Sequence, residues 1–304
     1  MTTRVRRLPL AVVMIGALSA PLAAQRDFSN VQIRTERLTE SLFVLMGAGG
    51  NIGLSIGEDG PFVVDDQFAP LTAKIKMAIA EVSDRDVRWV LNTHWHGDHT
   101  GGNENFGEGG AFIVAHDNVF KRLNPAEFRE LVGERSSQMP DAGMPVVTFD
   151  RTMTFHWNGE DIRIFRVAHA HTDGDAVVHF QKGDVVHMGD TFFNGSYPFI
   201  DVDSGGNVNG MIHSAEAVLG FATSNTKIIP GHGPVTDATG LRSYRDMLMT
   251  VRDRVLTMVN DGASQEEVLA SNPTDGFDEI WAARGDQWTA RFVVSVYRSL
   301  TEGR

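Results

Sequence analysis

The sequence predicts an α/β protein in which sheets are layered against helices. Short apolar or alternating runs, which are typical of strands, recur along the chain together with longer stretches that have helical spacing. Polar residues beside glycines follow several of these runs, and layered α/β proteins place functional side chains on such loops because the sheet holds them. The 304 residues, 42% of them hydrophobic, are enough for a sizeable core.

The first half of the chain is predicted to consist mainly of strands. Alternating or apolar residues predict strands at 31–36, 41–47, 50–56, 61–66 and 87–93, with a helix at 70–83. A short strand at 111–115 then leads into a charged, helical stretch that continues through Glu134.

The second half repeats this organisation. After a loop at 143–145, the pattern predicts strands at 146–155, 161–167, 176–181 and 184–189, followed by helices at 208–222, 238–260 and 286–300. Helical spacing predicts that one face of the long helix packs in a core, namely Tyr244, Met247, Leu248, Val251, Val255, Met258 and Val259. Because no linker rich in Pro, Ser or charge separates the halves, residues 25–304 are predicted to form a single domain.

Residues 1–24 have the pattern of a signal peptide. Three arginines precede the apolar run 8–18, and small residues follow it. The run is shorter than the roughly 20 residues that span a bilayer, and Pro9 and Pro21 disfavour the alternative of a buried N-terminal helix. Arg6-Arg7 fits the twin-arginine route as well as the general secretory one. We therefore expect a periplasmic or secreted protein with no membrane insertion after the signal is removed.

The charge of the chain limits its partners. The formal net charge is −12, and removing residues 1–24 makes it more negative because that segment holds three arginines and no acidic residue. Such a charge repels phosphate backbones, so we expect a small-molecule substrate and no nucleic acid. No pattern in the chain indicates an oligomeric state.

A cluster of metal-binding side chains follows the strand predicted at 87–93. His94, His96 and Asp98 stand two apart, so in extended chain they project to one side, and Gly97 allows His99 to approach the same point. Imidazole and carboxylate groups are ligands for zinc or iron. A solvated polar loop is the alternative, but such loops rarely carry three histidines and an aspartate at these spacings.

Three further candidate ligands lie at strand ends elsewhere in the chain. His171 follows the strand predicted at 161–167, Asp190 ends the apolar run 185–190, and His232 follows a short apolar run beside two glycines. His169 competes with His171 as a ligand. His171 is favoured because it opens the stretch His171-Thr172-Asp173-Gly174-Asp175.

These motifs, taken in order, resemble those of the metallo-β-lactamase superfamily from about residue 31 to the end of the chain. The resemblance implies an αββα sandwich of two mixed sheets flanked by helices, with two Zn²⁺ ions per chain. It implies that His94, His96 and His171 hold one ion, that Asp98, His99 and His232 hold the other, and that Asp190 bridges them. It also implies that Asp65 supports the site without binding metal, and we assign the same supporting role to His169 and His187.

Departures from particular branches of the superfamily narrow the expected activity. The chain has no Cys, which excludes the β-lactamases that use a cysteine at the second metal, and Asp190 at that position resembles glyoxalase II and the lactonases. His96 stands where the iron-using flavoprotein relatives carry a glutamate, which disfavours an iron redox role. The stretch after Asp190 suggests residues of a substrate pocket, namely Phe192, Phe193, Asn194 and Tyr197.

The resemblance implies a hydrolase in which a metal-bridging hydroxide opens cyclic amide or ester bonds, with Asp98 aiming the hydroxide. β-Lactams are the favoured substrate, and a lactone, ester or thioester hydrolase is the alternative. An iron-dependent persulfide dioxygenase and a non-catalytic metal-binding protein are the remaining hypotheses. No basic residue that would anchor a substrate carboxylate is evident, because Lys182 and Lys227 lie in or beside strands.

Overall fold

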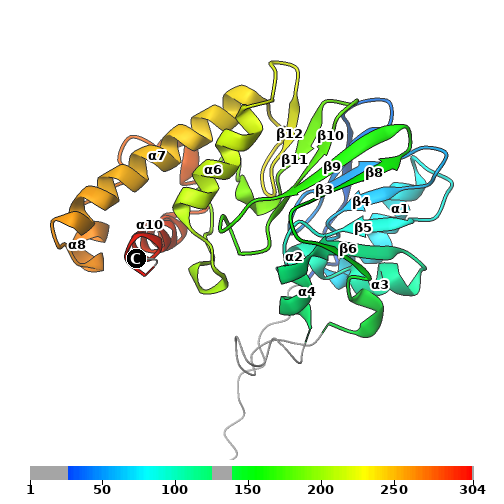
Figure 1. Cartoon of the computed structure of the whole chain (residues 1–304), viewed down its shortest axis with the longest axis horizontal. Coiled ribbons are helices and arrows are strands. Elements are labelled where there is room, and N and C mark those ends of the chain that lie inside the picture. The colour runs from blue at the N-terminus through cyan, green and yellow to red at the C-terminus, as the bar shows by residue number, and fades with distance from the viewer. Residues whose placement is uncertain (1–26, 125–138, 303–304) are drawn as a thin grey trace, which may run out of the picture. The chain divides into compact units, whose positions relative to one another are not determined.

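Two mixed β-sheets packed face to face form the centre of the molecule, and helices cover their outer faces (Figure 1). The computed structural model describes residues 27–124 and 139–302, and residues from Val31 onward form one compact unit. The predicted signal peptide lies outside the described residues. So does the part of the predicted helical stretch from 125 to Glu134.

The first sheet has seven strands in sequence order, antiparallel from β1 to β4 and parallel from β4 to β7. Its strands are β1 (Arg34–Arg37), β2 (Leu42–Met46), β3 (Ile52–Ser55), β4 (Phe62–Val64), β5 (Trp89–Leu91), β6 (Phe112–His116) and β7 (Val147–Phe149). The helices of this half are η1 (Ala69–Leu71), α1 (Thr72–Ala80), α2 (Gly97–Thr100), α3 (Asn103–Glu108), α4 (Asp117–Leu123) and η3 (Asp141–Gly143).

The second sheet has five strands in the order β12-β11-β10-β9-β8, with only β11 and β12 parallel. Its strands are β8 (Thr152–Trp157), β9 (Glu160–Arg166), β10 (Ala176–Phe180), β11 (Val185–His187) and β12 (Lys227–Ile229). The helices of this half are η4 (Gly189–Thr191), η5 (Val202–Ser204), α6 (Val208–Leu219), α7 (Ala238–Asn260), α8 (Gln265–Ala270), α9 (Asp278–Trp281) and α10 (Asp286–Thr301). The expected fold class is thereby confirmed.

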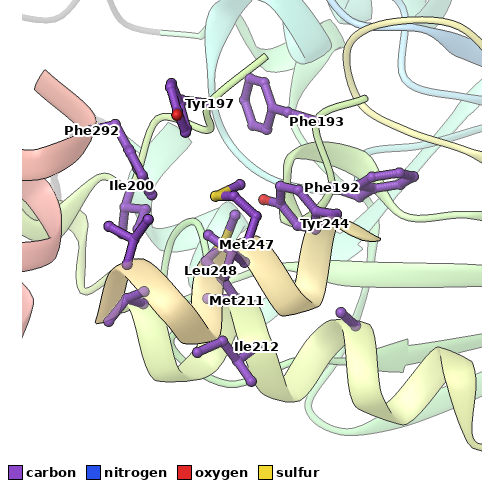
Figure 2. Packing of buried hydrophobic residues seen from close by; sticks show 14 of the residues in the cluster. Phe192, Phe193, Tyr197, Ile200, Met211, Ile212, Tyr244, Met247, Leu248 and Phe292 are labelled. Carbon is purple, nitrogen blue, oxygen red and sulfur yellow. The ribbon is translucent and has the colours of Figure 1, made fainter. Parts of the chain in front are cut away.

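The alternation of side chains along the strands supplies two separate cores. In β10, Val178 faces the first sheet and belongs to a core between the sheets that also contains Val64 and Leu91. Val177 faces the other way, into a core between the second sheet and helices α6, α7 and α10. Figure 2 shows this helical core, where Met247 of α7 lies near Met211 of α6. Every member of the predicted face of α7 is buried or packs against this core.

The single strand predicted at 146–155 is wrong, because the structure divides it between the sheets. β7 pairs with β6 in the first sheet, and β8 pairs with β9 in the second. The alternation of Phe149 with Met153 and Phe155 keeps the same phase across the connecting residues Asp150 and Arg151, so the pattern carries no sign of the break. This short connection joins the two halves of the sandwich.

None of the helices in the described part of the chain combines the length and apolar character needed to cross a bilayer.

The core between the sheets should dominate stability at Ile164, which lies in β9 and is fully buried. We expect Ile164→Ala to lower the free energy of unfolding by about 2–5 kcal/mol, because the change removes buried methyl groups and leaves a cavity. Val146→Ala, at a side chain that is 64% exposed, serves as the control and should change it little. Urea unfolding followed by circular dichroism makes the comparison, and equal midpoints for the two variants would contradict the assignment of Ile164 to the core.

Candidate metal centre

Loops from both sheets bring seven metal-binding side chains to one edge of the sandwich. In the first sheet, β5 is followed by His94 and His96, and α2 carries Asp98 and His99. In the second sheet, the chain after β9 carries one histidine, the turn η4 carries an aspartate, and the chain after β12 carries another histidine; these are His171, Asp190 and His232. Asp98 is in a helix rather than in the extended chain expected, because α2 begins at Gly97.

The first group consists of His94, His96, His171 and Asp190, whose facing atoms all lie within 4.8 Å of one another. His171 Nε2 lies 2.8 Å from His96 Nδ1 and 3.5 Å from Asp190 Oδ2. His94 Nε2 lies 3.9 Å from the same carboxylate oxygen. Four ligand atoms converge here from two sheets.

The second group consists of Asp98, His99 and His232. His232 Nε2 lies 3.4 Å from Asp98 Oδ2, and His99 Nε2 lies 3.9 Å from it. Asp190 reaches this group as well, with Oδ1 3.0 Å from His99 Nε2 and Oδ2 3.4 Å from His232 Nε2. The carboxylate of Asp190 therefore lies between the two groups.

In four of the histidines, the ring nitrogen that points away from the centre (the outer nitrogen) forms a hydrogen bond, and this bond determines the state of the inner nitrogen that faces the centre. His171 Nδ1 donates to the carbonyl of Phe199 at 2.8 Å, and His96 Nε2 donates to Asp201 at 2.9 Å. In the neutral rings, His171 Nε2 and His96 Nδ1 are then both lone pairs, and they face each other at 2.8 Å. Two facing lone pairs repel unless a cation binds both.

The same reasoning applies to the other buried histidines of the centre. Thr93 Oγ1 donates to Asp65, so it accepts from His94 Nδ1 at 3.1 Å, and His99 Nδ1 lies 2.7 Å from Asp65. Of the atoms that remain, His94 Nε2 is buried and has no hydrogen-bond partner, and His99 Nε2 is buried facing Asp190 Oδ1 at 3.0 Å. Buried polar atoms are almost always paired, so the unpaired His94 Nε2 fits a bound metal.

The electrostatics also fit cations at this position. Burial opposes ionisation of Asp190, but His232 and His99 outweigh it and hold the pKa of that carboxyl well below its ordinary value. Burial lowers the pKa of His171 to about 4, which keeps this imidazole neutral and able to ligate at neutral pH. For His99, burial is outweighed by Asp190, Asp65 and Asp98, which raise its pKa well above the ordinary value. The carboxylates thus attract a positive charge to this place.

Comparison with known proteins agrees with the geometry. The family model of the metallo-β-lactamase superfamily matches residues 49–247, a range that contains all seven side chains. The chain belongs to the metallo-β-lactamase superfamily. Members of this family typically bind metal ions through clusters of histidine and aspartate, as found here.

A curated relative and several solved structures are similar to this superfamily member. The lactamase-like protein aptB of Emericella nidulans is 29% identical over 168 residues, which cover 52% of this chain and 42% of that protein. The DIM-1 metallo-β-lactamase has a TM-score of 0.59 at 20% identity and covers 72% of this chain and 99% of its own. The sec-alkylsulfatase Pisa1 from Pseudomonas sp. has a TM-score of 0.68 at 16% identity and covers 88% and 50%. At these identities the solved structures show a shared fold.

The supporting residues expected from the resemblance lie at different distances from the two groups of this superfamily member. Asp65 is buried against His99 and Thr93, with a left-handed backbone (φ 63°) that aims its carboxylate at them. His187 is buried and donates from Nε2 to the carbonyl of Asn51. His169 is exposed and hydrogen-bonded to Gly205, whereas His171 is buried within the first group, so the geometry favours His171 as the ligand.

Of the four residues expected to line a substrate pocket, two lie in the helical core and two lie beside His232 or the loop that follows it. Phe192 and Tyr197 are fully buried in the helical core (Figure 2), so their side chains present no surface to a substrate. Phe193 is also buried, but its ring stacks on His232 with centroids 5.1 Å apart. Asn194 donates to the carbonyl of Pro234, in the loop that follows His232.

Close backbone approach at Gly231 brings the His232 loop against Asp190. A Cβ atom on Gly231 would lie 2.1 Å from Asp190 Oδ1 and 2.5 Å from the carbonyl carbon of Gly189. Only glycine fits there, and the Gly231 amide donates to the carbonyl of Gly189 at 2.7 Å. The glycines beside His232 thus serve a packing purpose.

Sequence reasoning missed Asp201, which orients His96. Asp201 belongs to the turn before η5, and Ser204 N donates to its other carboxylate oxygen. Burial raises the pKa of Asp201, but the hydrogen bonds from His96 and Ser204 outweigh it and lower the pKa to about 2. Nothing near residue 201 in the sequence marks a partner 105 residues away.

We expect Asp201→Asn to weaken metal binding about 10- to 100-fold, because a charged partner on the outer nitrogen strengthens and orients a ligating imidazole. As a control, Asp203→Asn changes an exposed carboxylate of the same turn, which pairs with Arg298. This variant should leave the metal affinity unchanged. Competition with a chromophoric chelator measures both affinities. An unchanged affinity in Asp201→Asn would show that the contact does not support the ligand.

Proposed function

We propose that this protein is a zinc-dependent hydrolase that holds two ions through the seven residues and opens cyclic amide or ester bonds, with β-lactams as the favoured substrates. The observation that carries the proposal is the position of Asp190, whose buried carboxylate faces both groups, with Oδ1 3.0 Å from His99 Nε2 and Oδ2 3.4–3.5 Å from His232 Nε2 and His171 Nε2. Histidine and carboxylate ligands without thiolate suit zinc. Together with the predicted signal peptide, the proposal assigns the enzyme to the periplasm or the exterior of the cell.

Each of the two ions would be bound by its own set of ligands among the seven residues. His94, His96 and His171 would hold the first, while Asp98, His99 and His232 would hold the second, and Asp190 would serve both. Bound zinc supplies a Lewis acid for a carbonyl and a water whose pKa falls from 15.7 to roughly 7. No serine or cysteine nucleophile is then needed.

Asp98 differs from Asp190 in a way that suits a part in the reaction. The Asp98 side chain is 27% exposed, compared with 5% for Asp190, so Asp98 borders the open side of the centre. Burial opposes its ionisation, but His99 and His232 outweigh burial and lower the pKa of this carboxyl far below its ordinary value. An ionised Asp98 accepts a hydrogen bond from a reacting water and aims it, and it does not retain the proton.

A lactone or other ester is the second candidate substrate. Asp190 occupies the position at which cysteine-containing β-lactamases have a thiolate, and in this respect the chain resembles the lactonases and glyoxalase II. The iron-dependent persulfide hypothesis is weaker, because His96 is directed at His171 as part of the first group. The non-catalytic hypothesis is weaker too, because the ligand set is complete.

Zinc-loaded protein should hydrolyse a penicillin, a cephalosporin or a carbapenem, lose the activity to a chelator and recover it with zinc. Asp98→Asn should lower kcat roughly 100-fold, because it removes the negative charge and replaces one of the two oxygens that can accept a hydrogen bond from the reacting water with an NH2 donor. Asp246→Asn, on the exposed face of α7, should retain full activity.

A spectrophotometric panel of β-lactams, lactones and thioesters decides between the candidates. Turnover of lactones or esters without any β-lactam turnover would replace the first proposal by the second. The absence of turnover on the whole panel would contradict the hydrolase proposal itself.

A further inference from the structure

An arginine from the C-terminal part of the chain contacts aromatic rings beside the candidate metal centre. Arg284 belongs to the turn between α9 and α10. Its guanidinium carbon is 5.4 Å from the centroid of the Phe193 ring and 4.5 Å from that of Trp288. These distances are those of cation–π contacts, which hold a guanidinium face while leaving its N–H edge free.

Phe193 connects this arginine to the second group of ligands. The ring of Phe193 contacts Arg284 and also stacks on His232, with an interplanar angle of 25°. Asp190 and Asp98 are both near enough to act on the charge of Arg284: burial lowers the pKa of the guanidinium, and these two carboxylates oppose the shift. Arg284 therefore lies on the side of the centre where Asp98 and His232 meet.

Hydrogen bonds from both ends of the turn that carries Arg284 join it to Tyr197, in the segment that follows Asp190. Tyr197 N donates to the carbonyl of Trp281 at 2.7 Å, and Trp288 Nε1 donates to the carbonyl of Tyr197 at 2.7 Å. Gly285 has φ 83°, a left-handed conformation that lets the chain reverse directly after the arginine. These contacts fix the backbone of the turn, and the rings of Phe193 and Trp288 contact the exposed side chain of Arg284.

Arg284 has no anionic partner of its own. Within residues 27–124 and 139–302, no carboxylate or carbonyl forms a hydrogen bond or ion pair with its guanidinium. The two lysines considered from the sequence are engaged elsewhere, Lys182 with the carbonyl of Gly159 and Lys227 with the carbonyl of Leu38. A cation at the border of a metal centre, oriented by two rings and left unpaired, is suited to an anionic ligand.

Aromatic rings continue from Arg284 to the first group of ligands. Phe199 lies 6.3 Å from Trp288 and 6.1 and 5.9 Å from the rings of His96 and His171. A ligand that spans both metal groups would therefore have an apolar wall beside it and a guanidinium at one end.

We propose that Arg284 binds a carboxylate of the substrate, so that the enzyme selects anionic substrates and holds them with the scissile bond toward Asp98 and Asp190. This inference rests on the proposed hydrolase function and specifies its substrate class. Arginine binds carboxylates through two parallel N–H···O bonds, which also fixes the orientation of the ligand.

A pair of thiol ligands that differ only in charge tests the proposal on the zinc-loaded protein. The probes are 2-sulfanyl-3-phenylpropanoate and its amide, since a thiolate binds zinc in either compound. By titration calorimetry, we expect the acid to bind at least about tenfold more tightly than the amide, and Arg284→Ala to remove that difference. Arg284→Lys should retain part of it, and Arg291→Ala, an exposed position on α10, should retain all of it.

Affinity for the amide should be the same in wild type and Arg284→Ala, which shows that the variant is folded and loaded. Unchanged affinity of Arg284→Ala for the acid, equal affinity of the wild type for the two probes, or binding of neither probe would each overturn the proposal.

Kinetics separate this proposal from the function on which it rests. With benzylpenicillin, Arg284→Ala should raise KM about tenfold and change kcat much less, because the contact is made in ground and transition states alike. A preference for the acid in a protein that hydrolyses no β-lactam would retain the anion site and reject the function. Hydrolysis with an unchanged KM in Arg284→Ala would reject the anion site and retain the function.

Discussion

The buried carboxylate of Asp190 is the constraint on which the rest of the centre depends. Removing an ionised carboxylate from water is costly unless positive charge compensates for it, and the groups nearest to Asp190 that can carry such charge are the imidazoles of His99, His171 and His232. Four imidazoles of the centre have their outer nitrogens committed to Thr93, Asp201, Asp65 and the carbonyl of Phe199. The inner nitrogens of His94, His96 and His171 are then lone pairs that face the centre, an arrangement that cations would stabilise.

The fold supplies this arrangement by bringing the two sheets together at one edge. The apolar faces of β4, β5 and β6 pack on those of β9, β10 and β11, so the loops that follow strands of either sheet meet. Hydrogen bonds between the loops then fix their relative position. Asn51 of the first sheet donates to the carbonyls of Pro230 and Gly233, which flank His232, and accepts at its own carbonyl from His187. Packing between the sheets and ligand geometry are therefore coupled.

The sequence predicts which residues come together at the centre because these residues carry local signals. His94, His96, Asp98 and His99 fall within six residues. His171, Asp190 and His232 each follow a recognisable strand, and the last two are next to a glycine. The long helix α7 is equally clear, because seven of its side chains are buried and they repeat on one face. The boundary between β7 and β8 is lost because the alternation continues through it. Short helices such as α2 and α9 have too few residues to show a period.

Residues that act across the fold have no local signal. Asp201 contacts His96 and Arg284 contacts Phe193, and both partners lie far away in the sequence. Neither Asp201 nor Arg284 lies in a motif that would predict its contact. Phe192 and Tyr197 show the opposite error: aromatic residues after a strand suggested a pocket, but the helices α7 and α10 cover them. Whether an aromatic side chain faces a ligand or a core depends on which helix packs over it, and this is decided by tertiary contacts.

The central claim is that the seven residues bind two zinc ions, and the metal content of the purified, zinc-reconstituted protein tests it most directly. Elemental analysis after removal of loosely bound metal should give two zinc ions per chain in the wild type. Asp190→Ala should lose one ion more readily than the other, since its carboxylate faces both groups while three histidines complete the first. One ion or fewer per fully loaded wild-type chain would contradict the claim, as would iron as the predominant metal in protein isolated without reconstitution.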